Sequence, residues 1–263
     1  MTEATGAPAR DTGFVQSLER GLAVIRALSA PESQTLSDVA RTTGLTRATA
    51  RRFLLTLERL GYVRQDQGRF SLTPQVLELG HAYLSSLTLP ELAQPHLARL
   101  VERVHESSSV SVLDGDEVVY VARVPTRRIM TVSINVGTRF AAHATSMGRV
   151  LLAGLTPEAR AHALDSVALE AYTPATITTR AALEAELDRV ARDGYALIDQ
   201  ELEAGLRSVA VPIHDPGGLV VAAMNLSVSA ASMSPTEMRR RLLPPLRETA
   251  AAIERDLAMV PGT

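Results

Sequence analysis

Apolar residues return every third or fourth position near the start of the chain, which predicts two amphipathic helices. The first is expected over residues 17–29, with Ser17 capping its first turn. Its apolar stripe is Leu18, Leu22, Ile25 and Leu28. The second is expected from Leu36–Ser37 to Gly44, because glycine readily adopts the left-handed conformation that ends a helix. Together they predict a small helical core.

A third helix is predicted from Arg47 to about Leu60, with Thr46 as its N-cap and Gly61 after its end. The positions expected to face the core are Ala50, Phe53, Leu54, Leu57 and Leu60. The opposite face is Ala48, Arg51, Arg52, Leu55 and Arg59. A basic outer face is typical of a recognition helix that enters the major groove of DNA. A plain three-helix cluster with a solvated arginine face is the alternative.

The segment after this helix favours DNA binding. Residues 62–65 and 69–72 alternate in strand fashion around Asp66-Gln67-Gly68, which predicts a β-hairpin. Gly68 permits the turn, and the tip offers Gln67 and Arg69 to a phosphate or a minor groove. The unit therefore has the pattern of a winged helix-turn-helix. The residues expected to contact DNA are Ser37, Thr46, Arg47, Thr49, Arg51, Arg52, Gln67 and Arg69.

Beyond residue 74 the pattern predicts a second, larger domain. A helix over residues 75–88 is expected to be a linker, and one over 90–105 has the apolar stripe of a helix packed on a sheet. Strands are expected at 109–113, 118–124, 129–136, 195–198, 208–213 and 219–228, and further helices at 146–152, 181–193 and 235–258. Strands flanked by helices in this order predict an α+β domain.

Length and composition agree with two soluble domains. The chain has 263 residues, 46% hydrophobic and 21% charged, and no apolar run long enough to cross a bilayer. We expect a disordered tail over 1–13, a winged helix-turn-helix over 14–74, the linker helix over 75–88 and the second domain over 89–263. The polar tail does not resemble a secretory signal, so a cytoplasmic location is expected. The lack of cysteine excludes disulfides, thiolate metal sites and thiol nucleophiles.

Charge is unevenly distributed although the net charge is only -2. All 27 basic residues are arginine. Residues 10–74 hold 10 arginines against 6 acidic residues, whereas residues 75–263 hold 17 against 22. Only the first domain therefore has the positive balance that suits phosphate.

Several motifs carry a family resemblance. They are Ser17-Leu18-Glu19-Arg20-Gly21-Leu22, Gly137-Thr138-Arg139, His143-Ala144-Thr145-Ser146-Met147-Gly148-Arg149, Gly194-Tyr195 and the segment from Asp199 to Gly205. With the order of elements, they resemble the IclR family of bacterial regulators over nearly the whole chain after residue 13. Residues 124–130 and 144–149 are more similar to the branch with PcaU, PcaR and PobR, which regulates aromatic acid breakdown through the β-ketoadipate pathway. The resemblance implies a C-terminal α/β, GAF-like effector-binding domain.

Partners follow from this interpretation. A single winged helix buries little surface, and two-fold proteins read palindromic sites. We therefore expect a homodimer or a dimer of dimers on a double-stranded DNA operator with two-fold character. We expect no membrane partner and no cofactor.

The second domain also holds residues that suggest an enzyme. Ser146 and His143 are close in sequence and Asp199 is available, so a hydrolase with an N-terminal interaction domain is the alternative function. The serine lacks the flanking-glycine elbow that exposes a nucleophile, and no two histidines have metal-ligand spacing. We therefore expect neither catalysis nor a metal.

Binding of a small acid explains this region better. The N–H groups at the start of the helix from Ser146 attract carboxylates, and Gly148 is expected to leave the approach open. The resemblance places further polar residues across the pocket; the full expected set is His143, Ser146, Met147, Gly148, Asp199, Ser208, Asn225 and Ser227. Ordinary sheet polarity is the alternative for the strand residues.

The expected effector is a small carboxylic acid, and the resemblance implies one such as protocatechuate or β-ketoadipate. Two arginines lie close in sequence to the start of this helix, Arg139 and Arg149, and either is a candidate to pair with the carboxylate of the effector. Arg139 is alternatively expected to pair with an acid such as Glu201 or Glu203.

Overall fold

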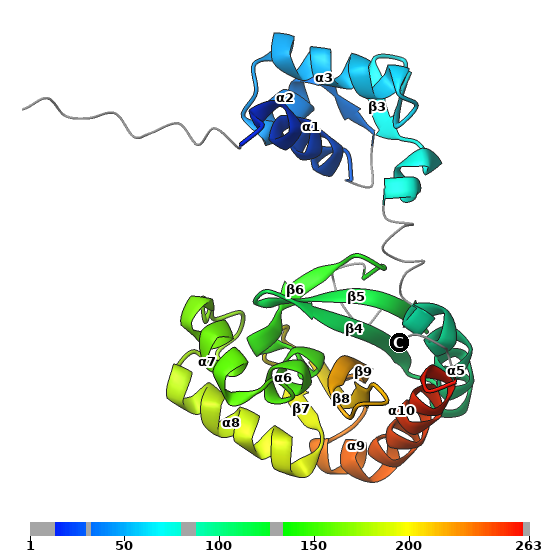
Figure 1. The fold of residues 1–263 in the computed structure, drawn as a ribbon, viewed down its shortest axis with the longest axis vertical. Coiled ribbons are helices and arrows are strands. Elements are labelled where there is room, and N and C mark those ends of the chain that lie inside the picture. Colours follow the sequence, from blue (N-terminus) through cyan, green and yellow to red (C-terminus); the bar gives the residue numbers. More distant parts are fainter. Residues whose placement is uncertain (1–13, 30–32, 80–87, 127–133, 260–263) are drawn as a thin grey trace, which may run out of the picture. The chain divides into compact units, whose positions relative to one another are not determined.

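The computed structural model describes residues 14–29, 33–79, 88–126 and 134–259. Contacts within the chain divide it into two units, Met1–Tyr83 and Leu84–Thr263 (Figure 1). Each unit is described by itself. The predicted disordered tail, residues 1–13, lies outside the described residues.

The first unit is a three-helix core with a small antiparallel sheet. Its elements are α1 (Gln16–Ala27), β1 (Gln34–Thr35), α2 (Leu36–Thr43), α3 (Arg47–Arg59), β2 (Val63–Asp66), β3 (Arg69–Leu72) and the 3-10 turn η1 (Pro74–Val76). The sheet has the order β1-β3-β2, so the predicted hairpin is confirmed and gains a short third strand. The core consists of Val24, Leu28, Val39, Ala40, Ala50, Leu54, Leu57, Val63 and Phe70.

Local chemistry explains where these elements begin and end. Gly44 ends α2 with φ +66°, as predicted, and the Thr46 hydroxyl accepts the Thr49 N–H at the start of α3. In the hairpin turn, Gln67 (φ +46°) and Gly68 (φ +78°) are both left-handed. Two such residues form the turn that matches the twist of paired strands. The turn residues themselves therefore favour the β2–β3 hairpin, which is the wing of this unit.

Helix α1 differs from its prediction. It begins at Gln16, and its N-cap Val15 makes no side-chain hydrogen bond, so Ser17 is not the cap. Leu18 and Leu22 are 63% and 40% exposed, while Val24 is fully buried. At 3.6 residues per turn both leucines lie on the far side of the helix from Val24. The predicted stripe was therefore right for Ile25 and Leu28, which pack on the core, and wrong for Leu18 and Leu22.

The second unit contains a six-stranded antiparallel sheet in the order β6-β5-β4-β9-β8-β7. The strands are β4 (Ser107–Asp114), β5 (Glu117–Val124), β6 (Arg139–Ala141), β7 (Ala196–Asp199), β8 (Leu206–His214) and β9 (Val220–Ser229). The helices are α5 (Thr88–Val104), α6 (Ser146–Ala153), α7 (Pro157–Ser166), α8 (Arg180–Asp193), α9 (Pro235–Arg241) and α10 (Leu243–Leu257), with the 3-10 turn η2 (Ala142–Ala144) before α6. The expected α+β architecture is confirmed.

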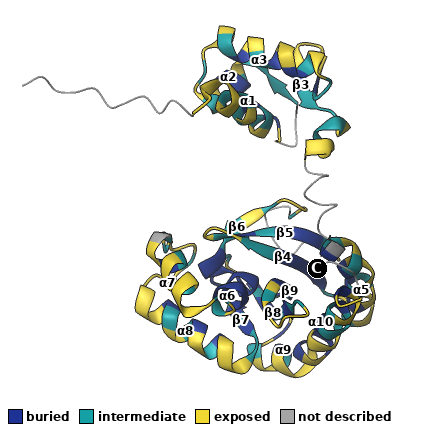
Figure 2. Cartoon of the chain, viewed as in Figure 1, coloured by how far each residue is buried: buried dark blue, intermediate teal, exposed yellow. Residues whose placement is uncertain are grey.

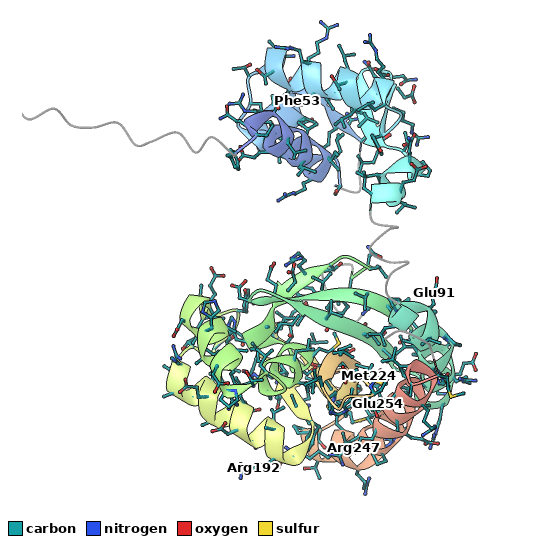
Figure 3. The ribbon with its side chains drawn as sticks, in the orientation of Figure 1. Phe53, Glu91, Arg192, Met224, Arg247 and Glu254 are labelled. Atoms are coloured by element: carbon teal, nitrogen blue, oxygen red, sulfur yellow. The ribbon has the colours of Figure 1, made fainter. Side chains whose placement is uncertain are left out.

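The two faces of this sheet carry different residues. Val209, Val211, Met224 and Leu226 point to one face and form a continuous apolar core with α5, α9 and α10 (Figure 3). The alternating residues on β4, β8 and β9 point to the other face, toward α6, and are mostly small or polar. Most residues of β4 and β9 are buried (Figure 2). The second face is therefore covered, and its polar residues lie beside a second apolar cluster in which Ala210 and Ala223 meet Leu151 of α6.

Four predictions need correction or lie outside the described chain. The strand expected at 129–136 falls partly on residues 127–133, which are not described, and residues 134–136 are not a strand; the edge strand is β6. Helix α7 was missed. The closing helix breaks at Leu242 into α9 and α10, because Pro244 and Pro245 can only begin a new helix. Of the linker helix, residues 77–79 are helical and 80–87 lie outside the description.

Candidate functional site

The outward face of α3 is basic and exposed. Arg47, Arg51 and Arg52 are exposed, and within the described residues no ion pair engages any of them. Ser37 on α2 and Gln67 at the hairpin tip are also exposed. Free guanidinium groups on a helix of this unit suit phosphate oxygens and base edges.

Three other predicted DNA-contact residues have local partners. The Thr46 hydroxyl accepts the Thr49 N–H at 3.2 Å and lies 2.9 Å from the Thr49 hydroxyl. Arg69 donates from Nε to the Ser33 hydroxyl at 2.9 Å and from Nη2 to the Ser33 carbonyl at 2.5 Å. These side chains hold the helix start and the wing in place.

A polar groove of about 400 Å³ runs between α1 and α3. It is lined by Gln16, Ser17, Arg20, Thr49, Arg52, Phe53 and Thr56. Arg20 was not among the residues predicted to contact DNA. The helical pattern of α1 does not state which neighbouring helix its polar residues face.

The start of α6 faces a small buried cavity of about 10 Å³ in the second unit. The cavity is lined by Tyr120, Ala144, Thr145, Ser146, Met147, Ile198, Leu202, Leu206, Ser208, Asn225 and Ser227. Of the eight residues predicted for the effector, five therefore meet here. This volume accommodates about one water molecule, so a larger ligand requires the lining to move.

Unsatisfied donors gather at this point. Thr145 caps α6 by accepting the Gly148 N–H at 3.0 Å. The Ser146 hydroxyl is 1% exposed and has no hydrogen-bond partner among the described residues. The first N–H groups of a helix also have no partner within it, and they carry the positive end of the helix dipole. The helix start thus offers donors to a polar ligand.

The sheet supplies the opposite wall of the cavity. Asn225 and Ser227 point the same way from β9, and Ser208 on β8 lies opposite Ser227. The Asn225 side chain accepts the Ser109 N–H at 3.1 Å and donates to the Ser227 hydroxyl at 3.1 Å. These groups are therefore oriented before any ligand binds.

Three predicted effector residues do not line the cavity. His143 Nε2 lies 3.1 Å from the Glu170 carbonyl, and Asp199 accepts Arg207 Nε at 2.6 Å. The Arg207 guanidinium lowers the pKa of the Asp199 carboxyl. A side chain at position 148 would place its Cβ 2.2 Å from the Ala142 carbonyl, so Gly148 permits close packing rather than access. The contacts of all three are structural.

The apolar part of the lining was missed. Tyr120, Ile198, Leu202 and Leu206 come from three strands and the β7–β8 loop, and only the folded sheet brings them together. Apolar residues in strands carry no signal that separates a pocket wall from ordinary core.

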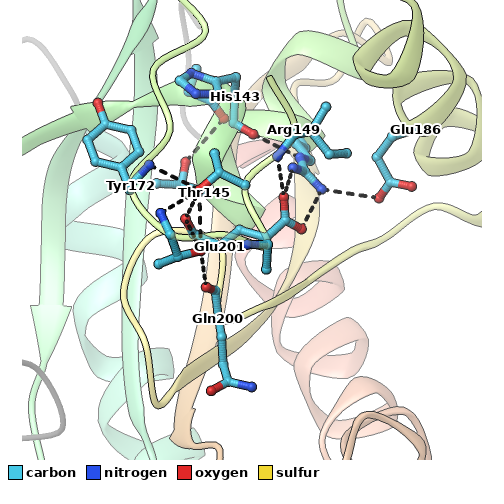
Figure 4. A network of polar contacts seen from close by, with 12 residues as sticks. His143, Thr145, Arg149, Tyr172, Glu186, Gln200 and Glu201 are labelled. Carbon is cyan, nitrogen blue, oxygen red and sulfur yellow. Dashed lines mark hydrogen bonds and ion pairs between the residues drawn. The ribbon is translucent and has the colours of Figure 1, made fainter. Parts of the chain in front are cut away.

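Both arginines predicted near the effector are already paired. Arg139 contacts Asp114 at 2.8 Å and Glu117 at 2.6 Å, not the expected Glu201 or Glu203. Arg149 is 1% exposed and forms a bidentate ion pair with Glu201 (Figure 4). Because the charge of each arginine is already neutralised by a carboxylate of the protein, neither is a good partner for a ligand carboxylate.

The Arg149 pair belongs to a network that holds the β7–β8 loop against α6 (Figure 4). Arg149 Nε donates to the His143 carbonyl at 2.9 Å, and Glu201 also accepts the Ile177 N–H at 3.2 Å. The Thr173 and Thr176 hydroxyls donate to the carbonyls of residues 200 and 201, at 2.7 and 2.6 Å. The loop that carries Leu202 of the cavity is thus fixed by buried polar contacts.

A hydrolytic triad is not assembled. Within the described ranges the Ser146 hydroxyl has no hydrogen-bond partner, His143 faces a backbone carbonyl, and Asp199 is paired with Arg207. Among the described residues, no three His, Asp or Glu side chains cluster as a metal site would require, and no helix has the length and apolar character to span a membrane.

Comparison with known proteins accounts for both units. Residues 17–67 match the IclR helix-turn-helix domain, and residues 81–255 match the C-terminal domain of the bacterial transcriptional regulator IclR. The chain is 42% identical to the Pca regulon regulatory protein of Pseudomonas putida, covering 94% of this chain and 84% of that protein. It is 37% identical to the p-hydroxybenzoate hydroxylase transcriptional activator of Acinetobacter baylyi, covering 92% and 91%.

A solved structure extends the comparison to the fold. The crystal structure of an IclR homologue from Microbacterium hydrocarbonoxydans, complexed with 4-hydroxybenzoate, is 29% identical and superposes with a TM-score of 0.80. It covers 92% of this chain and 99% of that one. These are regulators rather than enzymes, which removes the hydrolase alternative. The chain belongs to the IclR family of DNA-binding bacterial transcriptional regulators.

Proposed function

We propose that the chain is a ligand-responsive regulator of aromatic acid breakdown, with a DNA-binding domain over residues 14–74 and an effector-binding domain over 89–263. The observation that carries the proposal is the buried, unpartnered Ser146 hydroxyl at the start of α6, which faces a cavity lined by oriented polar groups. Relatives named for the Pca regulon and for p-hydroxybenzoate hydroxylase support the same pathway.

In this proposal α3 reads the operator. Arg47, Arg51 and Arg52 are exposed on one helix, and the groove beside them adds Arg20. Filter binding on operator DNA tests the assignment: Arg51→Ala and Arg52→Ala should each lose about 1–3 kcal/mol if the side chain reads a base. Affinity for DNA should fall steeply with salt, and effector binding should be retained. A double mutant with wild-type DNA affinity would rule out this face.

The regulator acts as a homodimer or a dimer of dimers on an operator with two-fold character. Two copies bring two recognition helices to successive major grooves, which a single small domain cannot do. Light scattering should report at least a dimer both free and on DNA. A monomer under both conditions would contradict the proposal.

The effector is a small carboxylic acid bound between the start of α6 and β9, by Ser146, Asn225 and Ser227 with Met147 and Ser208 beside them. The homologue bound to 4-hydroxybenzoate supports an aromatic acid. Calorimetric titration should detect binding of at least one of 4-hydroxybenzoate, protocatechuate, β-ketoadipate and benzoate, with phenol as the neutral control.

The variants of this titration locate the pocket. Ser146→Ala and Asn225→Ala should each lose about 1–3 kcal/mol of effector affinity, because a buried polar group of the ligand is left without its donor. Ser232→Ala, on an exposed turn after β9, is the matched control and should bind as wild type. If no acid binds better than phenol, or if both pocket variants bind as wild type, the pocket is misplaced.

A further inference from the structure

Arg123 lies on the same sheet face as the cavity. In the register of the sheet, Arg123 on β5 is opposite Ser109 on β4, and Ser109 is opposite Asn225 on β9. Side chains of directly opposed residues project from one face. Arg123, Ser109 and Asn225 therefore form a row across three strands, and Asn225 lines the cavity.

The guanidinium of Arg123 has donors to spare. Nη1 donates to the Ser109 hydroxyl at 3.0 Å, while Nε is buried without a hydrogen-bond partner. No carboxylate among the described residues pairs with it, in contrast to Arg139 and Arg149. Burial lowers the pKa of Arg123, but an arginine still remains charged at neutral pH. The Arg123 guanidinium is partly buried and its charge is met by one neutral hydroxyl, that of Ser109, so binding of an anion beside it is favourable.

Tyr120 connects this cation to the cavity. Tyr120 lines the cavity and lies opposite Ser111, two residues along β4 from Ser109, so the bulge between Val110 and Ser111 places Tyr120 and Arg123 on the same face of β5. Burial raises the pKa of Tyr120 to about 12, so its hydroxyl keeps its proton at neutral pH. The row between Arg123 and Asn225 contains only the short side chain of Ser109. A ligand that widens the cavity along this row therefore reaches the guanidinium.

We propose that Arg123 pairs with the carboxylate of the effector, and that the start of α6 with Ser146 takes the second polar group of the same molecule. This inference rests on the proposed function and moves the carboxylate from the helix start, where the sequence placed it. A full charge attracts a carboxylate more strongly than the partial charge of a helix end. The pocket thus selects acids with a polar group at each end, such as hydroxybenzoates and diacids.

The test separates ligand charge from ligand shape. The full-length protein is titrated calorimetrically with 4-hydroxybenzoate and its neutral amide, 4-hydroxybenzamide, and with adipate and adipamide. Wild type should prefer at least one acid over its amide by about ten-fold or more, the size of a charge-assisted hydrogen bond. Arg123→Gln should lose that preference while amide affinity stays within about three-fold. Arg139→Gln, an arginine paired on the next strand, is the matched control and should behave as wild type.

Two results with Arg123→Gln decide against the inference. If Arg123→Gln keeps the acid preference, or weakens acid and amide equally, Arg123 has only a structural role. If Arg123→Gln does not fold, Arg123→Lys is titrated instead. Lysine retains the positive charge, so this variant should still prefer the acid over the amide, and loss of that preference would contradict the inference. If wild type binds no acid at all, the proposed function has failed, which is a different result from a failure at Arg123.

Discussion

The two faces of the six-stranded sheet are made by the same strands but are stabilised in different ways. Met224 and Leu226 on β9 enter a continuous apolar core beneath α5 and α10. Asn225 and Ser227, their neighbours on the same strand, face α6 in a cavity lined by both polar and apolar side chains. On the first face the buried Ser108 hydroxyl is satisfied by the Asn225 carbonyl, whereas the second face buries donors that have no partner among the described residues.

This difference separates stability from ligand binding along one strand. An apolar face gains free energy wherever area is buried, and it is indifferent to the identity of a small ligand elsewhere. A polar face is stable only while its groups are paired, so a ligand that supplies missing partners changes its energy. The unpartnered Ser146 hydroxyl and Arg123 Nε are both on the polar side. A polar ligand therefore finds groups that lack partners on this face.

The largest expected effect breaks the ion pair that holds the polar face together. Glu201→Gln leaves Arg149, which is 1% exposed, with a neutral partner, and should lower the free energy of unfolding by about 3–5 kcal/mol. Glu186→Gln is the matched control and should cost much less, because Glu186 lies 3.6 Å from Arg149 and is shared with Arg189. Urea unfolding measures both. Equal losses would show that Arg149 does not depend on Glu201.

The next prediction concerns the apolar face. Leu226 is fully buried, and Leu226→Ala should lower the free energy of unfolding by about 2–5 kcal/mol through the cavity that it leaves. At temperatures where the variant is folded, its effector affinity should equal that of wild type. Asn225→Ala, one residue away, should lower effector affinity, and it should also cost about 1–3 kcal/mol of stability because the buried Ser109 N–H loses its acceptor. Thermal unfolding and titration of both variants check the comparison, and a Leu226 variant that loses effector affinity would show that the faces are coupled.

Elements with local signals were predicted well from the sequence. Gly44, Thr46 and Gly68 fix helix ends and a turn through their own backbone and hydroxyl chemistry, so α2, α3 and the wing follow from neighbouring residues. The buried side of α1 was predicted only in part, with Leu28 correct and Leu18 wrong, because contacts with α2 and α3 decide which residues are buried. The break between α9 and α10 had a local signal in two adjacent prolines that the apolar periodicity outweighed.

The site was predicted only in part, for the same reason. Ser146 and Asn225 were found from the helix start, strand alternation and the family resemblance. Tyr120 and Leu202 reach the cavity through strand order and a loop, which no local pattern encodes. The acidic partners of Arg149 and Arg139 could not be predicted either, because the sequence does not state which acidic residue the fold brings next to each arginine.

The smallest expected effect uses two adjacent serines that point to opposite faces. Ser108 is opposite Leu226 and donates to the Asn225 carbonyl at 2.7 Å, so Ser108→Ala should cost about 0.5–1.5 kcal/mol of stability and leave effector affinity unchanged. Ser109 instead accepts Arg123 Nη1 and so orients the guanidinium that we assign to the carboxylate. Ser109→Ala should therefore lower affinity for the acid by about three-fold, because the guanidinium must be ordered when the acid binds, with a smaller change in stability. Urea unfolding measures the stability of the two variants, and calorimetry measures their affinity for the acid. If Ser108→Ala lowers acid affinity as much as Ser109→Ala does, the two faces are not separate in function.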